Sequence, residues 1–121
     1  ESETFPDGMD IEIFSFRALE KAYFNVTKQY HKEHVTPYIK ENKNLFKIGE
    51  FKSRKNYKNV RLTVDVKNDL EVINILLEKL GENASWVDYK NYYLKNKLYE
   101  INGSQVRNYG LIKSINDEKL K

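Results

Sequence analysis

Asp65 is the residue of this chain whose type and position are best suited to chemistry. It ends the segment Arg61–Asp65, where alternating apolar side chains predict a strand that runs directly into a helix. In open α/β sheets ligands bind outside the carboxyl ends of the strands, and a carboxylate there suits a hard cation such as Mg²⁺ that bridges to substrate phosphates. The same spacing suits Asp65 or Asp69 as a helix cap, and spacing alone favours the cap.

Two further groups of polar residues could contact a substrate. Asp10 and Glu12 fall on one face of a short predicted strand, where they could bind a metal or sugar hydroxyls, or simply face solvent. Glu33 and His34 are neighbours, but side chains at i and i+1 do not face each other on a helix. His31 and His34 lack a third metal ligand, so they make a weak metal site.

The sequence contains no nucleophile motif and no glycine-rich phosphate loop. The segment 43–61 is basic instead, with seven lysines and arginines against the single acid Glu50. Such a run is usually a solvated face, and the alternative is a surface for nucleic acid or another protein. Most of the tyrosines fall at helix-core spacing, which favours packing over stacking on bases, so nucleic acid is not the expected partner.

Composition limits the function classes further. A length of 121 residues, of which 40% are hydrophobic and 32% charged, is typical of one globular domain. The absence of cysteine excludes disulfides and thiolate metal sites, and it agrees with a cytoplasmic location. No apolar run approaches the roughly 18 residues of a membrane helix, so no membrane partner is expected. The chain starts without methionine, which fits a processed protein or a piece of a longer one.

The elements that must position these residues alternate between strand and helix. Period-two patterns predict strands at 10–14, 45–51 and 61–66. Helical spacing predicts four helices: one after Ser15, one at 32–41, one at 70–80 and one from Ser85 to Gly103. The second could instead begin at Pro37, because proline is tolerated only in the first turn of a helix. The tail from residue 104 shows no clear period. Few strands with four or so helices predict an α/β layer architecture, whose missing strands could belong to residues outside this chain.

Six segments resemble, in order and at similar spacing, the spore-coat-polysaccharide cytidylyltransferases, which are relatives of the CMP-KDO synthetases. These segments are FPDGMDIEIFS (5–15), FRALEKA (16–22), EHVTPYI (33–39), LFKI (45–48), RLTVD (61–65, followed by Asp69-Leu70) and RNYG with KS (107–114). The chain departs from the family at 66–68, where the family's helix cap is replaced, and at Tyr109, where the family has glutamate.

The resemblance implies the C-terminal part of a Rossmann-like three-layer α/β sandwich, of the nucleotide-diphospho-sugar-transferase type. It also implies transfer of CMP from CTP to a sugar, expected to be acidic, with Mg²⁺ as the cofactor and pyrophosphate as the product. Asp65 would then be a metal ligand, and Arg61 would neutralise a phosphate or hold Asp65 in position. Asp10 and Glu12 would line the sugar side.

The same resemblance implies that Glu33, His34 and Thr36 lie near the sugar pocket or at a dimer contact. It places residues 1–121 as a single sugar-side and oligomerisation portion whose nucleotide-binding half is absent. We therefore expect this chain alone to bind CTP poorly and not to turn over, and we expect exposed sheet edges to favour a homodimer. The alternative is a non-catalytic module that binds nucleic acid or a protein through the basic segment 43–61.

Overall fold

The computed structural model describes residues 3–120, which divide into two compact units. Unit 1 comprises the chain up to Ile11 together with Phe51–Arg107, and unit 2 comprises Glu12–Glu50 together with the chain from Asn108 onward. Helices α1–α7 form the regular structure of the described residues, and none of them is long and apolar enough to cross a membrane. The expectation of a single portion over 1–121 stays a prediction, and each unit is described by itself.

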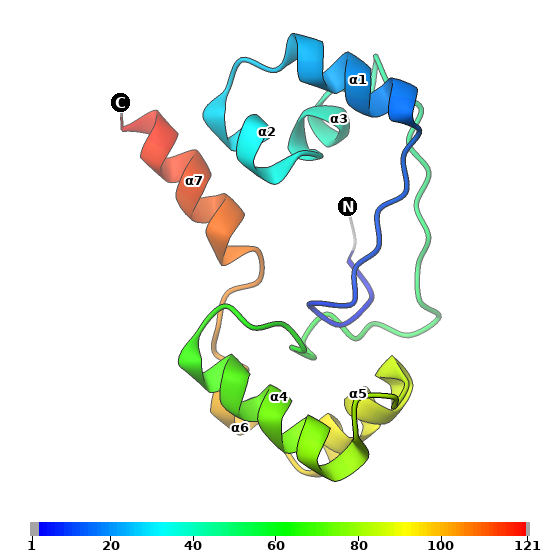
Figure 1. The fold of residues 1–121 in the computed structure, drawn as a ribbon, viewed down its shortest axis with the longest axis vertical. Helices are drawn as coiled ribbons and strands as arrows, with labels where there is room; N and C mark the ends of the chain where they lie inside the picture. The colour runs from blue at the N-terminus through cyan, green and yellow to red at the C-terminus, as the bar shows by residue number, and fades with distance from the viewer. Residues whose placement is uncertain (1–2, 121) are drawn as a thin grey trace. The chain divides into compact units, whose positions relative to one another are not determined.

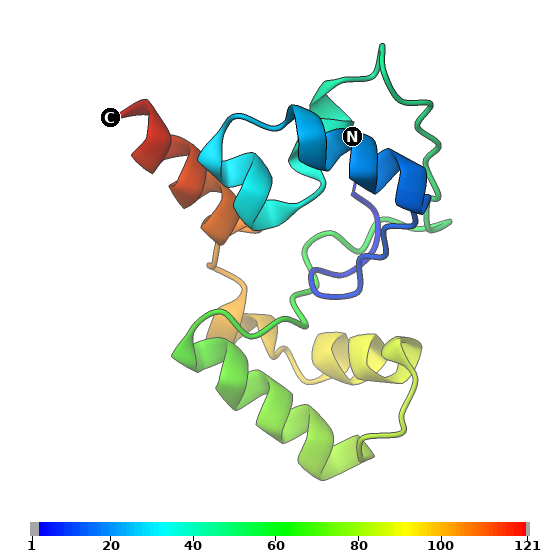
Figure 2. The ribbon, with the colours of Figure 1, turned by 45° about the horizontal axis from the view of Figure 1, so that its top comes forward.

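Unit 1 is built on α4 (Lys67–Leu80), which packs against both α5 (Trp86–Lys95) and α6 (Tyr99–Asn102) (Figures 1 and 2). Its core combines residues from these helices with two from the extended segment before α4, namely Val60, Leu62, Val72, Leu76, Tyr93 and Leu98. Val72 and Leu76 are one helical turn apart, so α4 presents them on the same face. This apolar face is what fixes α4 in unit 1.

The ends of these helices follow the predicted signals, with one exception. Gly81 ends α4 with a positive φ of 74°, and the Ser85 hydroxyl accepts a hydrogen bond from the backbone N–H of Asp88 at 3.2 Å to begin α5. The helix expected to continue to Gly103 is instead broken after Lys95. Lys97 has a φ of 54°, and this left-handed residue separates α5 from the short α6.

Unit 2 contains α1 (Phe16–Asn25), α2 (Gln29–His34), α3 (Pro37–Glu41) and α7 (Tyr109–Lys119). Ser15 caps α1 and Pro37 begins α3, as the sequence predicts. The residues 32–41 therefore form parts of two helices, separated where Val35 has a φ of 65°. Helix α7 was not predicted, and α2 packs against it (Figure 1).

The expected strands at 10–14, 45–51 and 61–66 are wrong for the described residues. Within residues 3–120 the only β pairing is an isolated parallel bridge between Asp7 and Arg61. In it, Asp7 N donates to Val60 O and Leu62 N donates to Asp7 O, both at 2.8 Å. A period-two pattern becomes a strand only beside a neighbour that completes its hydrogen bonds. Ile11 and Ile13, the apolar positions of the first expected strand, are 84% and 94% exposed.

Replacing Leu76 with alanine is expected to lower the free energy of unfolding of unit 1 by about 2–5 kcal/mol, because this side chain is only 1% exposed. The matched control is Leu77→Ala in the next position of α4, where the side chain is 42% exposed and the loss should stay below about 1 kcal/mol. The single tryptophan, Trp86, contacts Phe5 and Tyr57 in unit 1, so its fluorescence reports this unfolding in urea. Equal losses in the two variants would contradict this core assignment.

Candidate functional site

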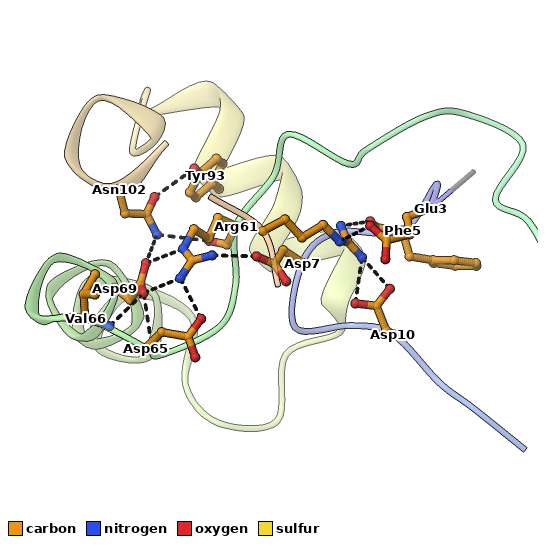
Figure 3. Close-up of polar contacts among 11 residues, drawn as sticks. Glu3, Phe5, Asp7, Asp10, Arg61, Asp65, Val66, Asp69, Tyr93 and Asn102 are labelled. Atoms are coloured by element: carbon orange, nitrogen blue, oxygen red, sulfur yellow. Dashed lines mark hydrogen bonds and ion pairs between the residues drawn. The ribbon is translucent and has the colours of Figure 1, made fainter. Parts of the chain in front are cut away.

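The guanidinium of Arg61 is buried in unit 1 and is bound by three carboxylates (Figure 3). Asp69 binds it through two parallel hydrogen bonds, from Nε to Oδ1 at 2.7 Å and from Nη2 to Oδ2 at 2.8 Å. Nη1 donates to Asp7 at 2.6 Å, and Nη2 donates to Asp65 at 2.8 Å. Arg61 is 4% exposed, so this set, the Arg61 network, satisfies a charge that would otherwise be buried alone.

The side chain of Asp69 also caps the start of helix α4. Its Oδ2 accepts hydrogen bonds from the backbone N–H groups of Asp65 at 3.0 Å and Val66 at 3.1 Å, while Val66 at the N-cap offers no side-chain acceptor. Asn102 donates to Oδ1 of Asp69 at 3.0 Å and accepts from the Tyr93 hydroxyl at 2.9 Å. Of the two aspartates that the spacing offered as a cap, Asp69 therefore has that role.

The electrostatics of the Arg61 network follow from these contacts. Burial by itself would raise the pKa of Asp69, but hydrogen bonds from Arg61, from the two backbone N–H groups and from Asn102 lower it to about 2. The hydrogen bond to Asp69 raises the pKa of Arg61 above its ordinary value despite burial. Burial raises the pKa of Asp7 by more than Arg107 and Arg61 lower it. Asp69 is thus the permanent counterion of Arg61.

Asp65 differs from Asp69 in its exposure. Its side chain is 49% exposed, Arg61 holds one carboxylate oxygen, Oδ2, and the other oxygen makes no hydrogen bond to any described residue. The carboxylate is therefore oriented on one side and free to bind on the other. A cation that is coordinated by one carboxylate oxygen and takes the rest of its coordination shell from other groups would suit this position.

Mg²⁺ fits that description only in part. The guanidinium of Arg61 already occupies the position between Asp7, Asp65 and Asp69 that a cation would need. Residues 3–120 contain no group of three or more histidine or carboxylate side chains that could hold a metal ion. Because Mg²⁺ commonly takes one or two carboxylates together with water and substrate phosphates, Asp65 could supply one ligand and this part of the chain would not supply the whole set.

Arg107 holds Asp10 in unit 1. Its Nη2 donates to both oxygens of Asp10, at 2.5 and 2.7 Å, its Nη1 donates to the carbonyl of Phe5 at 3.1 Å, and its Nε lies 2.6 Å from Glu3. Sequence reasoning missed this partner, because 97 residues separate Arg107 from Asp10. The only signal was that Arg107 begins one of the segments of the family resemblance.

Gly8 allows the chain near Asp7 to approach Arg61 closely. Its φ is 92°, and a Cβ at this position would lie 2.6 Å from the carbonyl oxygen of Leu62. A residue with a side chain would therefore clash with backbone and would adopt a strained conformation. The glycine of the Pro-Asp-Gly segment thus helps Asp7 reach the guanidinium.

Glu12 lies in unit 2, so the prediction that Asp10 and Glu12 share one strand face is wrong. Neither residue is in a strand, because this segment has no neighbour to pair with. Glu12 instead forms an ion pair with Lys40 of α3. Burial acts to raise the pKa of Glu12, but hydrogen bonds from Lys40 and Thr36 lower it below its ordinary value. Thr36 and Glu12, two predicted substrate residues, are thus brought together.

Glu33 and His34 meet through Ser114 of α7. The Ser114 hydroxyl lies 3.0 Å from Glu33 Oε2 and 3.1 Å from His34 Nε2, although Ser114 is 81 and 80 residues away from them in the sequence. Gly110, one turn earlier in α7, lies beside the imidazole, because a Cβ there would be in ordinary van der Waals contact with His34 Cε1 at 3.9 Å. His31 is buried and contacts Glu41 at 3.0 Å instead, so it does not join His34 as a metal ligand.

Two known proteins are similar to this chain. A cytidylyltransferase from Leptospira borgpetersenii has a structure that matches this chain with a TM-score of 0.75 and 34% sequence identity, over 86% of this chain and 43% of that one. The chain has a cytidylyltransferase-like fold. An uncharacterised protein of Methanocaldococcus jannaschii is 45% identical over 67 residues, which are 54% of this chain and 28% of that protein. No protein family model matches the chain.

The match supports part of the expected architecture. The nucleotidyltransferase fold of that cytidylyltransferase agrees with the predicted class, whereas the described residues here are mostly helical and contribute almost no β pairing. The chain spans less than half of the length of each protein it matches. The spore-coat-polysaccharide subclass, and the position of this chain within the longer protein, stay predictions.

The two aspartates that follow Arg61 are expected to differ sharply in their effect on stability. Asp69→Asn removes the bidentate counterion of a buried guanidinium and should lower the free energy of unfolding by about 3–5 kcal/mol. Asp65→Asn, with a half-exposed side chain, should lower it by less than about 1 kcal/mol. Urea titrations followed by Trp86 fluorescence measure both. The account fails if Asp65→Asn is the more damaging change.

Acid should destabilise unit 1 through Asp69. Its pKa falls from 3.8 to about 2 on folding, so the carboxylate stabilises the folded state above pH 4 and loses this contribution as the pH falls toward 2. A pKa shift of this size corresponds to a contribution of roughly 2 kcal/mol to the free energy of unfolding. The raised pKa of Asp7 acts in the opposite sense and offsets part of it. The free energy of unfolding, measured between pH 5 and pH 2, should decline, and a flat profile would contradict the assignment.

Proposed function

We propose that this chain is the sugar-side part of a nucleotidyltransferase that transfers CMP from CTP to a sugar. The observation that carries the proposal is the oriented, half-exposed carboxylate of Asp65, in a chain that is 34% identical to the matching cytidylyltransferase. The sugar is expected to be acidic and the product to serve the synthesis of a surface polysaccharide. Both expectations rest on the resemblance of the sequence to the spore-coat-polysaccharide enzymes.

In this proposal Asp65 is a ligand of Mg²⁺, and the remaining ligands come from CTP, water and parts of the protein beyond this chain. Bound Mg²⁺ would neutralise charge on the phosphates and orient the attacking sugar oxygen. Arg61 acts as a positioning residue, because its donors already bind Asp7, Asp65 and Asp69 within a buried site. This arrangement favours the second of the two roles that the sequence offered for Arg61, which was to hold Asp65 in place.

Each unit, taken by itself, contains polar residues that could bind sugar hydroxyls. Asp10 in unit 1 accepts from Arg107, while Glu12 and Thr36 interact in unit 2 and Glu33 and His34 meet at Ser114. Carboxylates and hydroxyls that are already held by neighbours are suited to bind sugar hydroxyls, because little freedom is lost on binding. We propose Asp10 as a sugar contact of unit 1, and Glu12, Glu33, His34 and Thr36 as sugar contacts of unit 2.

The proposal includes a homodimer in the cytoplasm. Helix α1 and the segment before it expose large apolar side chains, since Ile13 is 94%, Phe16 78%, Tyr23 73% and Phe24 76% exposed. An exposed apolar surface of this kind is typical of a protein–protein contact, and a second copy is the expected occupant. The chain alone is expected to bind CTP poorly and not to turn over.

One observation favours the alternative of a binding module. Lys52, Arg54, Lys55 and Lys58 are all exposed in unit 1. Phe51, 88% exposed, stacks on Phe5 with a centroid distance of 5.7 Å beside them. Exposed aromatic rings among cations suit a single-stranded nucleic acid. This function would show as an affinity that falls steeply with salt and that does not depend on Asp65.

The test of CMP transfer uses the longest natural chain that contains this sequence. Release of pyrophosphate from CTP is measured with acidic sugars as acceptors, and Asp65→Asn should lower kcat by about 100-fold or more, since an interaction with the reacting phosphates is lost. The matched control is Asp117→Asn, an exposed aspartate of α7 outside the proposed site, which should leave the rate unchanged. Full activity of Asp65→Asn at saturating Mg²⁺ would remove Asp65 from the mechanism.

A further inference from the structure

Unit 1 contains a pocket that is separate from the Arg61 network. It has a volume of about 560 Å³ and lies between the loop before Arg61 and helices α5 and α6. Its lining combines two amides, two aromatic rings, two aliphatic side chains and one glycine, from Asn56, Asn59, Tyr57, Tyr99, Val60, Leu94 and Gly103. Pockets for small molecules span about 300–1,000 Å³ and are lined mainly by apolar and aromatic groups with a few polar ones. This pocket matches both criteria.

The two aromatic rings are held in place by their neighbours. Tyr57 is fixed through its backbone, which donates to the Thr4 carbonyl at 2.8 Å. Its ring meets the edge of Trp86 at 6.1 Å, and the ammonium of Lys90 lies 4.5 Å from the ring centroid. Tyr99 packs against the buried Tyr93 at 6.4 Å. Because neither ring has to be ordered on binding, a ligand that stacks on them loses little free energy to conformational entropy.

Hydrogen-bonding groups at this pocket are left unused. The amide of Asn59 and the hydroxyls of Tyr57 and Tyr99 make no hydrogen bond with any other described residue. Asn56 uses its carbonyl oxygen to accept from the backbone N–H of Lys58 at 3.0 Å and keeps its amide donors. The pocket therefore offers several neutral donors and acceptors beside flat aromatic surfaces.

The charge of the lining narrows the class of ligand. None of the described residues that line the pocket is charged, and the nearby ammonium of Lys90 already lies 4.5 Å from the centroid of the Tyr57 ring. The lining itself therefore offers no ion pair to a phosphate or carboxylate. A neutral pyranose ring satisfies the lining better, because its C–H faces pack on aromatic rings while its hydroxyls bind amides and phenols. We propose that this pocket binds a neutral pyranose, as a second carbohydrate site distinct from the acceptor site of the proposed CMP transfer. The inference does not depend on that activity.

The test is a titration of the ¹⁵N-labelled 121-residue chain with neutral methyl pyranosides of glucose, galactose, mannose and N-acetylglucosamine. At least one of them should give saturable shifts of the backbone amides at 56–60 and 99–103. Tyr99→Ala should weaken this binding by about tenfold, in keeping with loss of one stacking surface, and Tyr99→Phe should weaken it less. Tyr109→Ala, an exposed tyrosine in unit 2, is the matched control and should bind normally.

Three outcomes would overturn the inference. The first is the absence of shifts at 56–60 and 99–103 with every neutral pyranoside at tens of millimolar. The second is stronger binding of cytidine or glucuronate at the same amides, which would assign the pocket to a base or an acid. The third is equal weakening by Tyr99→Ala and Tyr109→Ala. Because the readout is binding by this chain, a failure here leaves the proposed CMP transfer untouched.

Discussion

The buried guanidinium of Arg61 is the constraint on which unit 1 depends. A buried cation destabilises a fold unless its donors are paired, and here Asp69 pairs two of them while Asp7 and Asp65 pair others. Asp7 links the segment near the start of the chain to Arg61, and Asp69 caps the start of α4. Asn102 and Tyr93 extend the same network to α6 and α5. One interaction thus ties together segments that have little secondary structure to join them.

Binding to Arg61 gives two chemically identical side chains, Asp65 and Asp69, different roles. Asp65 and Asp69 both bind Arg61, yet Asp69 has no exposed surface and a pKa of about 2, whereas the side chain of Asp65 is 49% exposed. Since Asp69 provides the permanent counterion and the cap of α4, Asp65 is not needed for either role. Because Asp69 has the structural role, Asp65 can bind a ligand, and this is why we assign the proposed function to Asp65.

Local signals in the sequence predicted several helix ends correctly and the strands poorly, and they missed helix α7. Ser15, Pro37, Gly81 and Ser85 mark real helix ends, because capping acts within a few residues. The strand at 10–14 is wrong since a strand needs partners that its own pattern does not supply. The contacts Arg61–Asp7 and Arg107–Asp10 join residues 54 and 97 positions apart, so no local pattern could have revealed them. The family resemblance predicted that both Asp65 and Arg61 belong to the site. Only the structure shows that Arg61 binds Asp7, Asp65 and Asp69.

The most direct test of this account is the side-chain NMR spectrum of Arg61 in the ¹⁵N-labelled chain. A guanidinium fixed by Asp69 should show slowly exchanging, resolved Nε–H and Nη–H signals at neutral pH, because bidentate hydrogen bonds restrict rotation and exclude water. We predict that these signals persist in Asp65→Asn and disappear in Asp69→Asn. Fast-exchanging, averaged Arg61 signals in the wild-type chain, or their loss in Asp65→Asn alone, would contradict the account.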